Sequence, residues 1–293
     1  MKYASILILT ILVSSCCGTK KSIENQTSQT NKITVITKTP DVVEPSKEIE
    51  TPREVIPKMP LPHKPPKLDK TEVTNDSYSE AFNHARWNKL LQKNVTDTGK
   101  VDYKAFKNDS SELIVYIDDL THNTPNSDWS KNEKLAYWIN AYNALTIDLI
   151  IRNYPTKSIK DIKNPWDQRL WQFGKKWYNL NDIEHKILRK MDEPRIHFAI
   201  VCASVSCPKL SNEAYTSENL EHRLTKATKD FLSDSTRNNI STNSIEVSKI
   251  FQWFAKDFKK NGNLIDFLNR YSNIQISAKA KINYKGYNWD LNE

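Results

Sequence analysis

Residues 195–210 read RIHFAIVCASVSCPKL, and this stretch decides how the rest of the chain is interpreted. In an extended conformation Ile196 and Phe198 share one face and His197 lies on the other, and both faces are largely apolar. Such a run is typical of a central strand that is covered on both sides. Residues 196–202 are therefore predicted to form a strand in the middle of the fold.

The predicted strand ends at Cys202, where the apolar run gives way to small and polar residues. Pro208 cannot continue a strand ladder because it has no backbone N–H. A thiol therefore lies where a buried strand opens into a loop, and loops on a rigid support often carry function. Cys202 is the first candidate for a functional residue.

The N-terminus has the three parts of a secretory signal peptide. A lysine follows the initial methionine, residues 4–13 are apolar, and two serines precede Cys16. The apolar run is too short to span a bilayer, and residues 13–16, Val-Ser-Ser-Cys, resemble the bacterial lipobox. We predict a signal peptide over residues 1–15 and lipidation of Cys16. Several acyl chains would anchor the protein durably in a membrane. We therefore predict that the protein is located in the cell envelope, at the outer membrane, and that it faces the periplasm or the cell surface.

The segment after Cys16 has the composition of a tether. Residues 18–77 contain no aromatic side chain, and eight of the thirteen prolines of the chain lie between Pro40 and Pro66. Such a segment buries too little apolar surface to offset its ordering entropy. We predict a disordered, proline-rich tether over residues 16–77 and one globular domain over residues 78–293, an ordinary size for a single domain.

Charge and glycine content narrow the classes of partner. The net charge of +8 and the pI near 9.1 suit acidic partners such as anionic lipid or cell-wall polymer. The basic residues are scattered among acids, which argues against nucleic acid. Five glycines leave no phosphate-cradling loop, so no cofactor is predicted. The oligomeric state is left open.

Periodicity predicts an α+β domain with many helices packed around a small, mainly antiparallel sheet. The apolar spacing predicts helices over residues 81–91, 111–120, 131–154, 181–191, 220–232, 249–259 and 264–271, and further strands over 177–180, 245–247 and 274–284. The helix over residues 131–154 has the strongest signals, because Ser130 and Glu133 fit a capping box and Pro155 ends it. Its apolar residues cover most of its surface, which predicts burial nearly all round.

Two asparagines are conspicuous in this helix. Asn140 and Asn143 are spaced i, i+3, so they point to the same side of a helix that is otherwise apolar. A buried amide without partners costs about 1–3 kcal/mol, so both must be hydrogen-bonded. They either pin a neighbouring loop or take part directly in binding, for example by stabilising an oxyanion.

The segment before the predicted strand contains further polar candidates. Asn181 and Glu184 fit a second helix cap, which by itself accounts for Glu184. His185 and Arg189 are spaced i, i+4, and a surface pairing by itself accounts for His185. The nearby row Trp166, Trp171, Phe173, Trp177 and Tyr178 is expected to be hydrophobic cover rather than a carbohydrate or peptide groove.

Five motifs in order resemble the DUF547 domain family. They are KLAYWINAYN at residues 134–143, LNDIEH at 180–185, RIHFA with CASVSCP at 195–208, SKIFQWF with DF at 248–258, and YNWDLN at 287–292. The resemblance covers about residues 82–293, with Asn288 where the family has aspartate. It implies a DUF547-like domain. It implies no reaction, because the activity of the family is not established.

The first functional hypothesis is a thiol-dependent hydrolase or acyl transferase. A thiolate is nucleophilic, and a neighbouring histidine favours it by lowering the pKa of the thiol. Cys202 would be the nucleophile and His185 the base, oriented by Glu184 or an asparagine. His197, on the opposite face of the strand, could serve only if the strand breaks before Cys202. In outline this is similar to papain-like and transglutaminase-like enzymes, with a peptide or cell-wall peptide as substrate.

The alternative hypothesis is a tethered binding or structural module. Cys202 and Cys207 are the only cysteines of the globular part, and an exported protein folds in an oxidising compartment. A disulfide between them would close a small loop and remove the nucleophile. Arg195 and His197 would then be binding or scaffold groups. A zinc site from these cysteines and a histidine is disfavoured because the Cys-x4-Cys spacing is not that of a zinc ribbon, so no metal is predicted.

Overall fold

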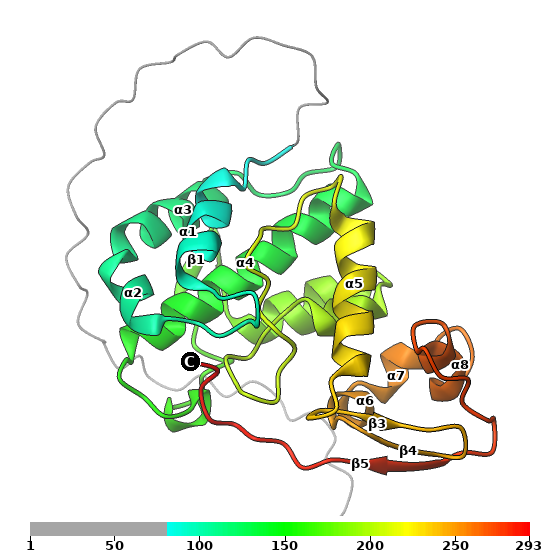
Figure 1. The fold of residues 1–293 in the computed structure, drawn as a ribbon. Helices are drawn as coiled ribbons and strands as arrows, with labels where there is room; N and C mark the ends of the chain where they lie inside the picture. Colours follow the sequence, from blue (N-terminus) through cyan, green and yellow to red (C-terminus); the bar gives the residue numbers. More distant parts are fainter. Residues whose placement is uncertain (1–80) are drawn as a thin grey trace, which may run out of the picture. The chain divides into compact units, whose positions relative to one another are not determined.

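The computed structural model describes residues 81–293. The predicted signal peptide (1–15), the predicted lipidation site Cys16 and the predicted tether (16–77) lie outside the described residues. In the part that is described, the fold is α+β, as predicted, with many helices and two small sheets (Figure 1).

Helix α4 (Lys131–Arg152) is the centre of the larger hydrophobic core. The predicted capping box is confirmed: the Ser130 hydroxyl accepts from the Glu133 N–H at 3.2 Å, and the Glu133 carboxylate accepts from the Ser130 N–H at 2.6 Å. Every residue from position 135 to position 151 is buried. A helix buried on all sides fixes the positions of the segments that contact it, including those that carry the candidate site.

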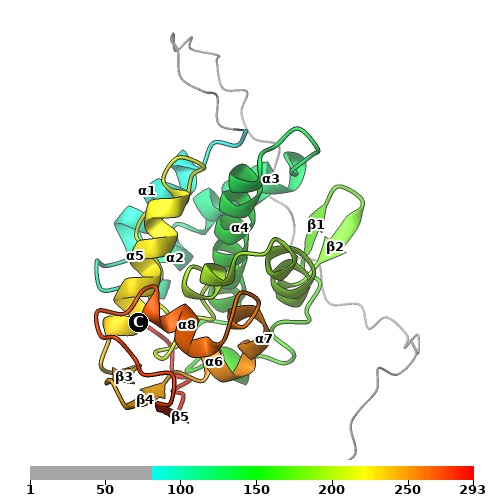
Figure 2. The same cartoon turned by 90° about the vertical axis from the view of Figure 1, so that its right-hand side faces the viewer.

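The other helices surround α4 on several sides (Figures 1 and 2). Helices α2 and α3 pack directly against α4, and α1 packs on both of them. The helices are α1 (Ala85–Asn94), α2 (Tyr103–Asn108), α3 (Ser110–His122), α5 (Leu220–Ser233), α6 (Ile250–Trp253), α7 (Ala255–Phe258) and α8 (Leu264–Asn269), with shorter 3-10 or π turns at Ile159–Asp161, Asp182–Ile187, Leu188–Lys190 and Pro194–Phe198.

The two sheets are separate. Strands β1 (Trp171–Phe173) and β2 (Lys176–Tyr178) form an antiparallel hairpin, which projects at the side of the domain in Figure 2. The second sheet has the order β3-β4-β5, in which β3 (Asn239–Ile240) pairs antiparallel with β4 (Ser244–Val247). Strand β5 (Lys281–Tyr284) pairs parallel with β4, so this sheet is mixed rather than mainly antiparallel.

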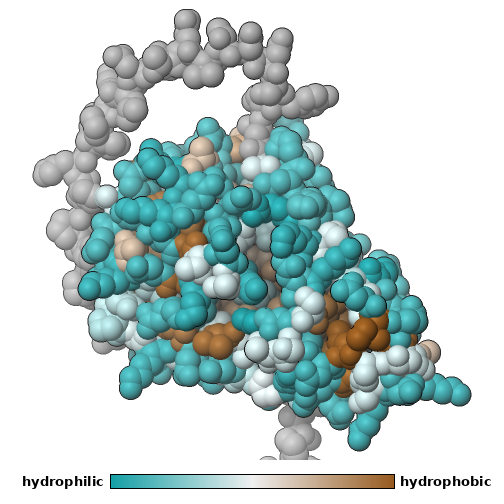
Figure 3. Space-filling model, viewed as in Figure 1, coloured by the Kyte–Doolittle hydropathy of each residue, from teal (hydrophilic) through white to brown (hydrophobic). Residues whose placement is uncertain are grey.

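A second hydrophobic core lies beside the three-stranded sheet. Its centre is a group of phenylalanines contributed by α5, α6, α7, α8 and the turn at Pro194–Phe198: Phe198, Phe231, Phe251, Phe258 and Phe267. The face of the domain seen in Figure 3 is mostly hydrophilic, with an apolar patch where these C-terminal elements lie. None of the helices in the described part of the chain is long and apolar enough to cross a membrane.

The predicted central strand over residues 196–202 is wrong. Pro194 begins a 3-10 helix that runs to Phe198, and the chain then turns at Ala199. The segment is as buried as predicted, with Ile196, Phe198 and Val201 each 1% exposed. A short apolar run does not distinguish a buried strand from another buried conformation, and proline at the first helical position favours the helical turn.

Two other elements differ from the prediction in form. The predicted helix over residues 249–259 is two short helices, α6 and α7, because Phe254 leaves the helical conformation and its ring stacks on His197 at 4.0 Å. The predicted strand over residues 274–284 contracts to β5, its last four residues.

The last residues of the chain close over the loop that follows Cys202. Val205 N–H donates to the Asp290 carbonyl at 2.8 Å, and Ser206 N–H donates to the Asn288 carbonyl at 3.2 Å. On the other side, the Ser158 hydroxyl donates to the Trp289 carbonyl at 2.7 Å. The terminal segment therefore joins two loops that are far apart in sequence and holds its own aromatic side chains between them.

Candidate active site around the Cys202–Cys207 disulfide

Asn140 and Asn143 hold backbone segments in place. The Asn143 amide donates to the Ala199 carbonyl at 2.9 Å and accepts from the Val201 N–H at 3.0 Å. The Asn140 amide makes the same pair of bonds to Tyr215, at 2.7 Å and 3.1 Å. Both side chains are nearly fully buried. These bonds show the predicted pinning of neighbouring backbone by both amides, and neither Asn140 nor Asn143 is among the residues that line the cavity beside the disulfide.

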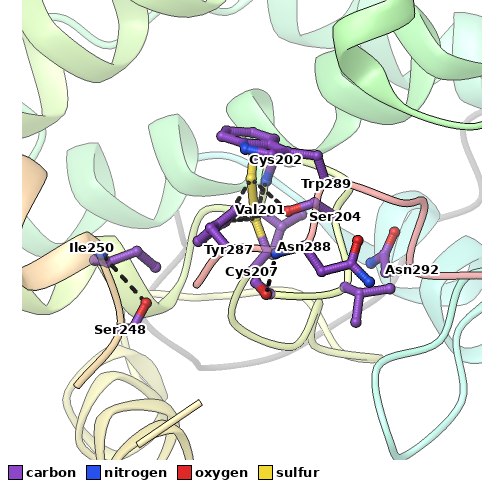
Figure 4. The surroundings of a disulfide bond; sticks show 12 residues. Val201, Cys202, Ser204, Cys207, Ser248, Ile250, Tyr287, Asn288, Trp289 and Asn292 are labelled. Carbon is purple, nitrogen blue, oxygen red and sulfur yellow. Dashed lines mark hydrogen bonds between the residues drawn. A yellow bond between two sulfur atoms is a disulfide. The ribbon is translucent and has the colours of Figure 1, made fainter. Parts of the chain in front are cut away.

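Cys202 and Cys207 form a disulfide, with their Cα atoms 6.2 Å apart. Between them, Ala203 adopts a positive φ of 56°, a conformation that is unfavourable for a residue with a Cβ atom. This turn brings Ser204 back toward the sulfur atoms (Figure 4). Cys207 is buried and Cys202 is half-buried, so Cys202 is the more accessible of the two residues.

Hydrogen-bond donors converge on the two sulfur atoms. The Cys202 N–H donates to Cys207 Sγ at 2.9 Å, and the Tyr287 hydroxyl lies 3.2 Å from Cys202 Sγ and 3.3 Å from Cys207 Sγ. The Ser204 hydroxyl lies 3.2 Å from both Cys202 Sγ and the Tyr287 oxygen. Burial raises the pKa of Tyr287 to about 12, so its hydroxyl keeps its proton at neutral pH and can donate it.

The disulfide lines a cavity of about 220 Å³, which we call the site cavity. Glu184 and His185, from the turn at Asp182–Ile187, and His197, from the turn at Pro194–Phe198, also line it. Aromatic side chains make up much of the rest of the wall: Tyr142, Trp166, Trp253, Phe254, Tyr287 and Trp289. A cavity lined by aromatic rings, with a few converging polar groups, is the usual form of a small-molecule or active site.

Glu184 is the one carboxyl group among the residues that line the site cavity. Burial raises its pKa to about 7, against the effect of a hydrogen bond from the Tyr142 hydroxyl at 3.2 Å. Its predicted role in a helix cap is wrong, because the side chain of Asn179, rather than that of Asn181, accepts from the Asp182 N–H at 2.7 Å. A carboxyl group with a pKa near 7 can both give and take a proton at neutral pH.

The two histidines belong to one charged network. Arg189 binds the Asp257 carboxylate through its Nε at 2.6 Å, and His197 Nε2 lies 2.8 Å from the same carboxylate. Partial burial raises the pKa of Asp257, but the bonds from His197 and Arg189 outweigh it and hold that pKa well below its usual range. Burial lowers the pKa of His197, so the ring is neutral and donates through Nε2.

His185 is not in the form that a general base requires. Its Nδ1 atom lies 3.1 Å from Arg189 NH1, which can only donate, so Nδ1 accepts and the proton of the neutral ring is on Nε2. Burial, followed by the charge of Arg189, lowers the pKa of His185. The predicted neighbours His185 and Arg189 are therefore in contact, but this geometry makes His185 a hydrogen-bond donor to the site cavity.

Arg195 lies away from the site cavity. Its guanidinium binds Glu193 at 2.7 Å and Glu221 at 2.6 Å, and it thereby ties the turn at Pro194–Phe198 to helix α5. These bonds raise the pKa of Arg195 further above its ordinary value. Of the predicted binding residues, His197 thus reaches the site cavity, whereas Arg195, Asn140 and Asn143 support the scaffold.

Several residues of the site were not candidates in the sequence. Asp257, Tyr287 and Trp289 come from segments more than fifty positions away from Cys202, so no local spacing links them to it. The only sequence signal was their position in motifs, DF at 257–258 and YNWDLN at 287–292. Of the predicted aromatic row, Trp166 lines the site cavity, Trp171 and Phe173 are buried as cover, and Trp177 is exposed.

A metal site and a second cavity are the alternatives to the site cavity. Within residues 81–293, no group of three or more histidine, cysteine, aspartate or glutamate side chains is arranged to hold a metal ion. A second cavity of about 420 Å³ lies along α5, but the charged side chains Arg223 and Arg237 that line it are already paired with Glu213 and Asp234. The site cavity therefore has the more distinctive chemistry.

Comparison with known proteins supports the domain family. Residues 126–232 match the family described as "Protein of unknown function, DUF547". The match contains Asn140, Asn143, Glu184, His185 and the disulfide, and it ends before the segments that carry Asp257 and Tyr287. It is therefore shorter than the resemblance over residues 82–293 that the motifs indicated. No curated protein and no solved structure matches the chain.

Proposed function

We propose that the DUF547-like domain is a thiol-dependent hydrolase or acyl transferase, with Cys202 as the nucleophile once an external dithiol has reduced the disulfide by exchange and has itself become a disulfide. The observation that carries this proposal is that the Cys202 N–H and the Tyr287 hydroxyl donate to the two sulfur atoms, with the Ser204 hydroxyl donating to the Tyr287 oxygen, in the same cavity as a carboxyl group with a pKa near 7. The sulfur of a disulfide is a weak acceptor, whereas a thiolate gains much more from such donors.

Reduction would divide these donors between the two cysteines. The hydroxyls of Ser204 and Tyr287 lie at Cys202 Sγ and would stabilise its thiolate, which lowers the pKa of the thiol. The Cys202 N–H points at Cys207 Sγ and would hold the buried partner. Cys202 is the more exposed residue, and an attacking thiolate must reach its substrate.

Glu184 rather than His185 is the proton carrier of this proposal. The Cys202 thiolate attacks the carbonyl carbon of an amide, protonated Glu184 gives its proton to the leaving amine, and a thioester forms. Ionised Glu184 then takes a proton from water, the hydroxide attacks the thioester, and the acid and the thiolate are released. An amine in place of the water would make the reaction an acyl transfer. A pKa near 7 lets one carboxyl group serve both steps.

The second candidate function is a non-catalytic binding module. The specific observation in its favour is the closed disulfide itself, whose Cys207 is only 3% exposed. If the bond is permanent, the site cavity has no nucleophilic thiol and its aromatic wall can only bind. The two candidates therefore differ in the reactivity of Cys202.

Alkylation of the Cys207→Ser variant tests the proposal. We expect Cys202 in this variant to react with iodoacetamide at pH 6 much faster than an ordinary thiol with a pKa of about 8.5 would. Tyr287→Phe should slow the reaction by about tenfold, the effect of raising the thiol pKa by about one unit. Tyr284→Phe, at an exposed tyrosine of β5, is the matched control and should change nothing.

Mass spectrometry of the wild-type chain, with and without dithiothreitol, completes the test. Cys202 should become alkylated once the bond is reduced. A disulfide that survives the reductant, together with a Cys207→Ser variant that is unreactive at pH 6, would eliminate the thiol mechanism and leave the binding module.

Under the same proposal the domain acts in the cell envelope, held at the outer membrane by lipid on Cys16. The lipobox-like residues 13–16 support this location. Labelling of expressing cells with radioactive palmitate should mark the wild-type chain, and Cys16→Ala should abolish the label. Equal labelling of the two proteins would refute lipidation at Cys16. The expected substrates there are peptides or the peptides of the cell wall.

A further inference from the structure

An exposed tryptophan lies at the rim of the site cavity. Trp253, the last residue of α6, is 46% exposed, although it also lines the cavity. Its ring lies 4.8 Å from Tyr287 and 5.8 Å from Trp289, centroid to centroid, and is tilted by only 28° from the Trp289 ring. The two indoles are therefore stacked on each other, and together with Tyr287 they form an aromatic wall between solvent and the disulfide.

The groups that line the site cavity carry little charge. They include no lysine or arginine, and their single carboxyl group, Glu184, has a pKa near 7. The two histidines are held neutral by burial. His185 is half-buried and presents an N–H donor, so polar groups that can hydrogen-bond a neutral ligand line the same cavity as the aromatic wall.

We propose that the Trp253–Trp289 wall binds a neutral saccharide ring at the mouth of the site cavity. The C–H hydrogens of a pyranose carry partial positive charge and pack on the negative face of an indole. The hydroxyls of the sugar can bond to His185 and Glu184. This inference rests on the proposed function and specifies its substrate class. The substrate would be a peptide that is linked to a glycan.

A saccharide fits this surface better than a free peptide does. A peptide that binds as an added strand needs a strand edge to bond its backbone, whereas the site cavity is lined by helices and loops. A peptide with free carboxylates would also need a cationic partner, which the lining does not contain. A neutral ring that stacks on indole needs neither.

Calorimetric titration of the oxidised wild-type protein with triacetylchitotriose tests the inference. We expect binding, and we expect Trp253→Ala to weaken it by at least about tenfold, or about 1.4 kcal/mol. Trp177→Ala is the matched control, because Trp177 is 49% exposed but lies on β2 and does not line the site cavity. The control should bind like the wild type. Trp253→Phe, which keeps an aromatic face, should retain part of the affinity.

The outcome is independent of the thiol chemistry, because the titration uses the disulfide form. Binding of the triose with the expected variant pattern supports the saccharide site even if alkylation rejects Cys202 as a nucleophile. The inference is overturned if the triose does not bind, or if Trp253→Ala binds it as well as the control does. It is also overturned if the peptide Ala-Glu-Lys-Ala-Ala binds while the triose does not.

Discussion

Asn143→Ala is expected to destabilise the domain by about 3 kcal/mol or more. The substitution removes both partners of a buried backbone segment, the donor to the Ala199 carbonyl and the acceptor of the Val201 N–H. Each buried group left without a partner costs about 1–3 kcal/mol. Few single substitutions have a larger effect, because most cost about 1 kcal/mol. Urea unfolding followed by circular dichroism measures the change in the free energy of unfolding.

Asn153→Ala is the matched control for this experiment. Asn153 is the exposed residue that follows α4, where its amide donates only to the Leu149 carbonyl at 2.8 Å. Water can replace that bond, so a change within about 0.5 kcal/mol is expected. A loss below about 1 kcal/mol in Asn143→Ala would contradict the pinning role that we assign to this amide.

The same amide shows what the sequence could not predict. Residues 196–201 are buried on all sides, as their composition predicts, and burial on both faces suggested a central strand. The backbone partner that a neighbouring strand would have supplied is instead the side chain of Asn143, more than fifty positions earlier in the chain. Periodicity reports burial, and it cannot report which group satisfies a buried backbone.

The elements that the sequence did predict have local causes. Helix α4 was predicted because its capping box, its apolar surface and Pro155 are all contained in one segment. The site itself has no such local cause. Cys202, Glu184 and His185 were candidates from nearby residues, but Asp257 and Tyr287 join them only through the folded chain. The burial of the Glu184 carboxyl group against Tyr142 was not predicted, because its spacing from Asn181 imitates a cap, whereas its burial arises from packing in the folded chain.

We expect the Glu184→Gln substitution to stabilise the domain more at pH 8 than at pH 4. The difference between variant and wild type in the free energy of unfolding should be about 3 kcal/mol larger at pH 8. In the folded state the carboxyl group has a pKa of about 7, against 4.5 as its ordinary value. Between these values the folded protein binds the proton more tightly than the unfolded chain. The contribution of Glu184 to the stability of the folded state is therefore fully present below pH 4.5 and is lost as the pH rises through 7. Glutamine is neutral at every pH and can still accept from the Tyr142 hydroxyl.

The comparison between variant and wild type isolates this effect from the histidines. Burial lowers the pKa of His84 to about 3 and also lowers those of His185 and His197, so these groups make stability rise with pH up to about 6.5. Because both proteins contain these histidines, their contribution cancels in the difference. Glu246→Gln, at an exposed position of β4, is the control and should stay within about 0.5 kcal/mol of the wild type at both pH values.

Thermal or urea unfolding at pH 4 and pH 8 provides the measurement, and parallel stability curves for Glu184→Gln and the wild type would contradict the raised pKa. The expected gain also bears on function. A carboxyl group that destabilises the folded chain at neutral pH contributes nothing to the scaffold that glutamine would not supply. Such groups are typical of active sites, where stability is lowered in exchange for reactivity. A Glu184→Gln protein that is more stable than the wild type but no longer turns over a peptide substrate would show that the same residue lowers stability and is needed for activity. This result would support Glu184 as the proton carrier.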